Sequence, residues 1–113
     1  RSYKVYKTKV VKNYISVIRH VVMIKLTEEK NTPEIANQIR NDLIELENRI
    51  ESLDRMDVGI NISTRPSAFD IVLTADCANE EALENYRIHP EHVKVLDYLK
   101  LVMDRIHVVD YII

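Results

Sequence analysis

The sequence contains almost no glycine or cysteine, and each scarcity excludes a class of functional site. Gly59 is the only glycine in 113 residues, so the chain has no glycine-rich loop of the kind that cradles phosphate groups. Cys77 is the only cysteine, which excludes an internal disulfide and the paired-cysteine spacings of zinc sites. A single thiol fits a reducing compartment, and we expect a cytoplasmic location.

Long apolar runs and a strong net charge are also missing, which limits the partners. No apolar run approaches the roughly 18 residues that span a membrane, so we expect no membrane partner. The formal net charge is −2, and although residues 1–16 hold five basic side chains and no acid, the rest of the chain is acidic. An acidic body opposes a nucleic-acid footprint, so we expect no nucleic-acid partner.

The length leaves room for one hydrophobic core, and we expect a single domain over residues 17–113. Residues 1–16 are interpreted as an N-terminal extension. Their valines and tyrosines have the β-propensity to add a strand to an open sheet edge. An ordered tail without a function is the simpler alternative.

Hydrophobic periodicity divides residues 17–113 into four strands and two helical regions. The clearest signal is an apolar stripe at steps of three and four over residues 32–53, opened by the cap residues Thr32 and Pro33. Alternation predicts strands over residues 17–26, 56–63, 69–77 and 106–113. A second helical region is predicted over residues 79–105, with Val93, Leu96, Leu99, Val102 and Met103 facing inward.

The order β-α-β-β-α-β is that of the ferredoxin-like α+β folds, which place both helices on one face of a four-stranded antiparallel sheet. The other face has no cover of its own, yet Val21, Met23 and Val72 must lie on it. Exposing apolar surface to water costs a free energy of ~25 cal/mol per Å², so a second copy packed sheet on sheet is the simplest cover. We therefore expect a homodimer formed through the open sheet face, a dimeric α+β barrel.

The side chains best suited to catalysis or ligand binding surround a predicted break in the second helical region. Pro90 fits the first position of a helix and biases His89 away from helical angles, so one helix should end near Ile88 and another begin at Pro90. Tyr86, His89 and His92 gather at this break. A phenol and two imidazoles can position a carbonyl oxygen and remove a proton, or they can be packing residues with satisfied polar tips.

His92 lies in the first turn of the predicted helix, where the positive helix end disfavours its protonation. A neutral His92 suits proton abstraction beside a carbonyl, with the Tyr86 hydroxyl holding the developing oxyanion. In the alternative, both residues are structural: His92 donates a hydrogen bond to a backbone carbonyl, and Tyr86 packs in the core. His20 lies on an apolar strand face. It either contacts a ligand or is a core residue whose hydrogen bonds are satisfied within the protein. His89 and His92 alone do not make a metal site, and we expect no metal.

Five segments of the chain resemble a known family. They are Arg19–Leu26, Phe69–Leu73, Glu80–Tyr86, the element His89-Pro90-Glu91-His92, and Val108–Tyr111. With these pieces, the chain from about Ile18 to Ile113 resembles the stress-responsive A/B-barrel (Dabb) family. The resemblance implies a dimeric barrel related in fold to small dimeric monooxygenases. Residues 1–16 lie outside it.

The resemblance also implies candidate roles. One plant branch of the family, the polyketide cyclase that makes olivetolic acid, works without a metal redox centre or organic cofactor, and we expect no cofactor here. Its catalytic tyrosine and histidine match Tyr86 and His92, and a further pocket histidine matches His20. Another of its histidines aligns with Ile71, where this sequence departs from the pattern.

Two classes of function follow from the sequence. In the first, the protein is a homodimeric stress-responsive barrel with a pocket for a small hydrophobic ligand and no turnover. In the second, it is a cofactor-independent cyclase-, lyase- or monooxygenase-like enzyme that uses Tyr86 and His92 on a carbonyl-bearing substrate. His20 and His89 are the predicted ligand-binding residues in either case.

Overall fold

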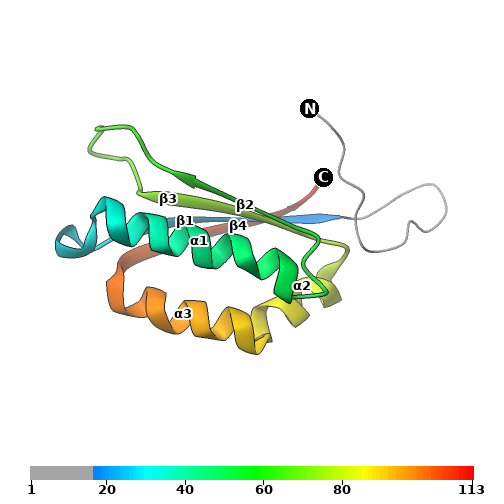
Figure 1. Ribbon diagram of the computed structural model, residues 1–113. Helices are drawn as coiled ribbons and strands as arrows, with labels where there is room; N and C mark the ends of the chain where they lie inside the picture. The colour runs from blue at the N-terminus through cyan, green and yellow to red at the C-terminus, as the bar shows by residue number, and fades with distance from the viewer. Residues whose placement is uncertain (1–16) are drawn as a thin grey trace.

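A computed structural model describes residues 17–113, and the predicted order of elements is confirmed within this range (Figure 1). The strand considered for residues 1–16 lies outside the described residues. The elements are β1 (Ile18–Leu26), a short 3-10 helix η1 (Glu28–Lys30), α1 (Pro33–Arg49), β2 (Arg55–Ile60), β3 (Ile71–Cys77), α2 (Glu80–Ile88), α3 (Pro90–Val102) and β4 (Met103–Ile112).

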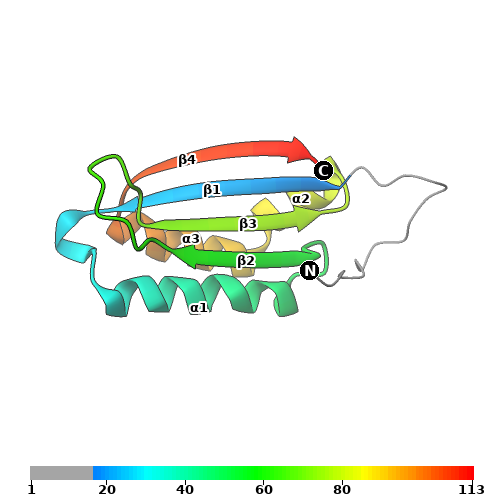
Figure 2. The ribbon, with the colours of Figure 1, turned by 90° about the horizontal axis from the view of Figure 1, so that it is seen from above.

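The four strands form one antiparallel sheet in the order β2-β3-β1-β4. The helices lie on one face of this sheet, and the view in Figure 2 looks onto the face that they leave open. This is the ferredoxin-like α+β fold expected from the order of elements. The core lies between the helices and the sheet, where Ile24, Ile39 and Leu53 are fully buried.

α1 forms where its caps and apolar spacing predict it. The Thr32 hydroxyl accepts a hydrogen bond from the Ile35 amide, and Pro33 occupies the first turn, where its missing N–H costs nothing. Every third or fourth residue faces the sheet, and Ala36, Ile39, Leu43 and Leu46 are buried. Ile50 and Leu53 are also buried, although they follow the end of the helix.

The second helical region breaks at the predicted place. The Asn79 side chain accepts from the Ala82 amide and starts α2, while His89, with φ −63° and ψ 135°, ends α2 and caps α3. The Nδ1 atom of His89 accepts from the Glu91 amide at 3.1 Å. Pro90 follows at the first helical position.

Several predicted boundaries and one predicted side-chain direction are wrong. β2 ends at Ile60 rather than residue 63. The side-chain amide of Asn61 donates to the Ser63 carbonyl and accepts from the Ser63 N–H, which turns the chain away from the sheet. Ile62, within this turn, is 98% exposed. β3 starts at Ile71 rather than residue 69.

α3 ends at Val102 rather than residue 105, because Met103 pairs with Leu26 in the sheet and the Thr27 amide bonds the Val102 carbonyl. Val93 is 39% exposed rather than inward. The inward stripe of α3 instead runs through His92, Val95, Leu96 and Leu99 at helical spacing.

The open sheet face keeps apolar side chains in contact with solvent. Met23, Val72, Val109 and Tyr111 are exposed, with exposed fractions from 39% for Val72 to 62% for Val109. β4 is an edge strand, and its other face also exposes apolar side chains, among them Val108 and Ile112. The apolar character predicted for the open face is therefore present in the structure.

The buried face of α1 gives a stability prediction. Ile39→Ala should lower the free energy of unfolding by roughly 2–5 kcal/mol, through lost burial and the cavity that remains. Gln38→Ala, at the exposed neighbouring position, should change it by less than about 0.5 kcal/mol. Urea denaturation of both variants measures the difference, and equal losses would contradict the assigned helix face.

Candidate functional site

A cavity of about 150 Å³ lies between the helices and the β1–β4 side of the sheet. Three of the four predicted site residues, Tyr86, His92 and His20, line it. Apart from Arg87, the rest of the lining is aliphatic: Val22, Ile24, Leu43, Leu73, Val95, Leu96, Leu99, Ile106 and Val108. The cavity is thus an apolar chamber with one phenol and two imidazoles on its wall.

Tyr86 is fully buried, on the inward stripe of α2. Its ring packs against the His92 ring, with centroids 4.3 Å apart, and meets the His20 ring edge-on at 6.2 Å. Burial, reinforced by the neighbouring Cys77 thiol, raises the pKa of Tyr86 well above its usual value. The phenol is therefore neutral at physiological pH and can donate a hydrogen bond.

His92 has its tautomer set by the helix junction. Its Nδ1 atom lies 2.8 Å from the Arg87 carbonyl oxygen, and because a carbonyl can only accept, Nδ1 carries the proton. The neutral ring then has a free lone pair on Nε2. Burial lowers the pKa of His92, and the positive charges of His20, Arg87 and His89 lower it further, although the carbonyl hydrogen bond opposes them. Burial is thus a larger cause than any single neighbouring charge.

His20 is held by a residue that the sequence analysis did not single out. Its Nδ1 atom lies 2.5 Å from Oδ1 of Asp110, its cross-strand neighbour on β4. The carboxylate accepts, so the Nδ1–H of His20 donates and its ring is fixed against the cavity. Asp110 shares the helix-facing side of β4 with Ile106 and Val108, an alternation visible in the sequence once the β1–β4 register is known.

His89, the fourth predicted residue, lies outside this cavity. Its side chain caps α3 and borders a separate groove on the outer side of α2. Ile71, at the position where the cyclase branch has a histidine, is buried in the core and does not line the cavity.

Metal and thiol chemistry have little support among residues 17–113. No group of three or more His, Cys, Asp or Glu side chains there is arranged to hold a metal ion. Cys77 is buried, and burial, together with the charges of Asp54, Asp76 and Asp110, raises the pKa of its thiol to about 12. A thiol with so high a pKa is a poor nucleophile at neutral pH.

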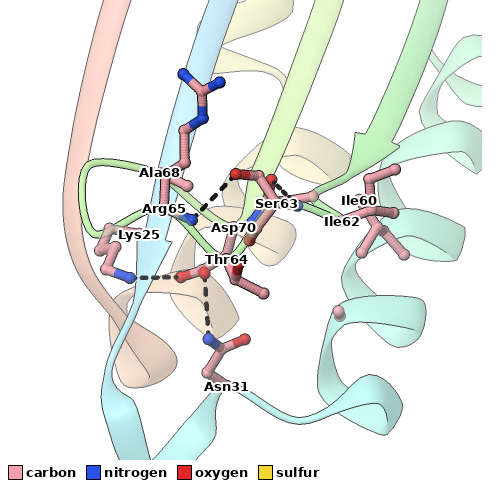
Figure 3. A pocket seen from close by; sticks show the side chains of 11 residues that line it. Lys25, Asn31, Ile60, Ile62, Ser63, Thr64, Arg65, Ala68 and Asp70 are labelled. Carbon is pink, nitrogen blue, oxygen red and sulfur yellow. Dashed lines mark hydrogen bonds and ion pairs between the residues drawn. The ribbon is translucent and has the colours of Figure 1, made fainter.

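A second hollow, of about 350 Å³, lies at the far end of the sheet beside the β2–β3 loop (Figure 3). The buried Asp70 carboxylate accepts from the Leu26 amide and the Asn31 side chain and pairs with Lys25 at 3.6 Å. The Arg65 side chain points away from this cluster (Figure 3). Because the protein itself satisfies Asp70, we interpret the cluster as an anchor for the loop.

These observations define an α+β sandwich of the ferredoxin-like class with a tyrosine–histidine cavity under its helices. The chain belongs to the stress-responsive A/B barrel (Dabb) domain family, whose model matches residues 18–113. The stress-response A/B barrel domain-containing protein DABB1 of Arabidopsis thaliana is 32% identical over 99 residues, which cover 86% of this chain. The chain spans less than half the length of the curated relatives it matches, 47% in the case of DABB1.

Solved structures share the fold at lower identity. A dimeric ferredoxin-like protein of unknown function from Bacteroides fragilis aligns with a TM-score of 0.79 and 24% identity, over 88% of this chain and all of that one. A hydroxynitrile lyase from Passiflora edulis aligns with a TM-score of 0.77 and 17% identity, over 88% of this chain and 95% of that one. Within the described residues, no helix is both long and apolar enough to cross a membrane.

The lowered pKa of His92 predicts a pH dependence of stability. A histidine whose pKa is lower in the folded state stabilises the fold fully above its unfolded pKa, near 6.5, and this contribution is lost as pH falls toward the folded value. Stability should therefore decrease from pH 7.5 to 5.5, and His92→Gln should reduce that decrease. Urea denaturation at both pH values tests this, and an equal decrease in both proteins would contradict it.

Proposed function

We propose that the protein is a homodimer that binds a small, apolar, carbonyl-bearing ligand in the cavity lined by Tyr86, His92 and His20. The observation that carries the proposal is the convergence of a buried neutral phenol and a histidine with a free Nε2 lone pair on one apolar chamber. The phenol supplies a donor for a carbonyl oxygen. The aliphatic wall accounts for an apolar ligand body.

The size of the cavity limits the ligand. A volume of about 150 Å³ is that of an engineered protein cavity that binds benzene. One six-membered ring or a short branched chain fits, and a long polyketide does not fit without movement of the walls. We therefore propose a single-ring or short-chain ketone or aldehyde as the ligand class.

The open sheet face supports the dimer. Four apolar side chains on β1, β3 and β4 are exposed there, an arrangement that marks association surfaces on soluble proteins. The similar structure from Bacteroides fragilis is described as dimeric. A second copy placed sheet to sheet covers these side chains without touching the helices or the cavity between them and the sheet.

Turnover is the second candidate function. The fixed tautomer of His92 and its lowered pKa favour a general base that stays neutral near pH 7. Proton abstraction at the carbon next to a carbonyl gives an enolate, and the Tyr86 hydroxyl can donate to its oxygen. Asp110 then serves to orient His20 beside the pair.

The dimer predicts a mass of about twice 13.3 kDa in sedimentation at micromolar protein concentration. Met23→Glu should dissociate or unfold the protein, because it places an unpaired charge in the sheet-to-sheet contact. Ile62→Glu, at a loop position that is already almost fully exposed, is the matched control and should remain dimeric. A folded wild-type monomer would disprove the dimer.

Ligand binding can be tested with acetophenone and ethylbenzene, which share a ring and differ in the carbonyl. The wild-type protein should bind acetophenone more tightly, as measured by calorimetry or by the rise in melting temperature. Tyr86→Phe should weaken acetophenone binding by about 1 kcal/mol, the loss of one hydrogen bond, and leave ethylbenzene unchanged. Tyr98→Phe, in the groove between α1 and α3 and outside the cavity, is the control. Failure of both compounds to bind would contradict this ligand class.

Turnover can be tested without the natural substrate. In D₂O, a protein that abstracts the methyl proton of acetophenone should accelerate hydrogen–deuterium exchange at that methyl group, which NMR follows directly. His92→Gln should abolish the acceleration, and His107→Gln, on the open sheet face, should not. Binding without any acceleration would identify a binding protein rather than an enzyme.

A further inference from the structure

The tyrosine–histidine cavity offers a ligand two hydrogen-bond acceptors that a carbonyl group cannot use. Nδ1 of His92 donates to the Arg87 carbonyl at 2.8 Å, and Nδ1 of His20 donates to Asp110 at 2.5 Å. Each neutral ring therefore keeps a lone pair on Nε2 and has no second proton to donate. The hydroxyl of Tyr86, which is neutral and buried, is the donor on the same wall.

A ligand with a carbonyl oxygen alone leaves both imidazole lone pairs without a partner. Its oxygen accepts from Tyr86, while the Nε2 atoms of His20 and His92 lose contact with water and gain no donor in return, which opposes binding. Arg87 also borders the cavity, but its guanidinium is more than half exposed and donates to Glu84. A ligand that brings a hydroxyl group together with its carbonyl satisfies this wall better.

The two imidazole acceptors differ in strength. The Nδ1–H of His92 bonds a neutral backbone carbonyl, whereas that of His20 bonds the carboxylate of Asp110. A hydrogen bond to a carboxylate is stronger and polarises the ring, which makes Nε2 of His20 the better acceptor. His20 keeps 12% of its side chain accessible and lines the cavity, so a ligand there can reach the ring.

The spacing of the three rings limits where the hydroxyl group can be. The Tyr86 ring centroid lies 4.3 Å from that of His92 and 6.2 Å from that of His20. Because both imidazoles surround one phenol in a cavity of about 150 Å³, a ligand that meets Tyr86 and His20 together needs its two oxygens close to each other. Oxygens on adjacent carbon atoms meet this condition.

We propose that His20, held by Asp110, makes the cavity selective for α-hydroxy ketones and α-hydroxy aldehydes. The carbonyl oxygen accepts from Tyr86, and the neighbouring hydroxyl donates to Nε2 of His20. Asp110 acts as a positioning residue, because it fixes the tautomer of His20 without touching the ligand. This selectivity rests on the carbonyl ligand proposed above and requires no turnover.

Two ligands of nearly equal shape test the selectivity. α-Hydroxyacetophenone and propiophenone share the ring, the carbonyl and the chain length, and differ by a hydroxyl in place of a methyl group. Transfer from water to an apolar cavity by itself favours propiophenone. At pH 8, where imidazole rings are neutral, the wild-type protein should nevertheless bind α-hydroxyacetophenone about fivefold more tightly in calorimetry, through the added hydrogen bond.

The outcomes separate this proposal from the one on which it rests. Equal binding of the two ketones, or tighter binding of propiophenone, overturns the selectivity and leaves the carbonyl-ligand class standing. Failure of both ketones to bind overturns the two proposals together.

Substitutions at His20 and Asp110 distinguish recognition from packing. His20→Phe keeps a ring and removes the acceptor, so the preference should reverse in favour of propiophenone. Asp110→Asn should weaken binding of α-hydroxyacetophenone and leave that of propiophenone unchanged, whereas a purely structural loss weakens both. Asp104→Asn, at an exposed acid on the same strand, is the matched control. If both site variants keep the wild-type preference, the proposal is wrong.

The tautomers can be measured directly from the ring ¹⁵N resonances at pH 8. His20 and His92 should carry their proton on Nδ1. His89 is an internal reference of the opposite tautomer, because its Nδ1 accepts from the Glu91 amide at 3.1 Å. Addition of α-hydroxyacetophenone should shift the Nε2 resonance of His20 more than addition of propiophenone does. A proton on Nε2 of His20 in the free protein overturns the proposal.

Discussion

The structure depends on the junction at His89 and Pro90, because it fixes the direction and the rotation of α3. Pro90 has no N–H to continue α2, and His89 takes extended angles and caps the next helix. The rotation that results places His92 in the stripe that faces the sheet, with Val95 and Leu99. The carbonyl of Arg87, freed near the end of α2, becomes the acceptor that fixes the His92 ring. This single break between α2 and α3 thus determines both the packing of α3 on the sheet and the chemistry of the cavity.

Packing and chemistry are coupled at Tyr86 in the same way. The burial that makes Tyr86 a core residue also keeps its hydroxyl neutral. Its contact with the His92 ring holds both groups in one orientation. The two interpretations offered for these residues, packing and chemistry, therefore describe the same contacts.

Features that rest on local periodicity could be predicted from the sequence. The α1 stripe, the caps at Thr32 and Asn79 and the break at Pro90 depend on neighbouring residues, and the structure confirms them. The convergence of Tyr86, His92 and His20 on one cavity required the fold, which the order of elements supplied. The chemical roles of these residues stay predictions.

Features decided by contacts distant in sequence could not be predicted. α3 stops at Val102 because Met103 gains a strand partner in Leu26, a preference that helical spacing does not reveal. Asp110 faces His20 only in the β1–β4 register, 90 residues away along the chain. The groove that His89 borders combines the turn after α1 with α2, so no short sequence window contains it.

β4 lies at one edge of the sheet, beside β1. Among the described residues it pairs with a single strand, β1, and both of its faces expose apolar side chains. Half of its backbone amides point to the free edge, where no other strand of residues 17–113 pairs with them. Yet this strand carries Asp110 and two residues of the cavity wall. The part of the site on β4 therefore depends, among the described strands, on the ladder to β1, and its local rigidity will follow whatever lies against the free edge of β4.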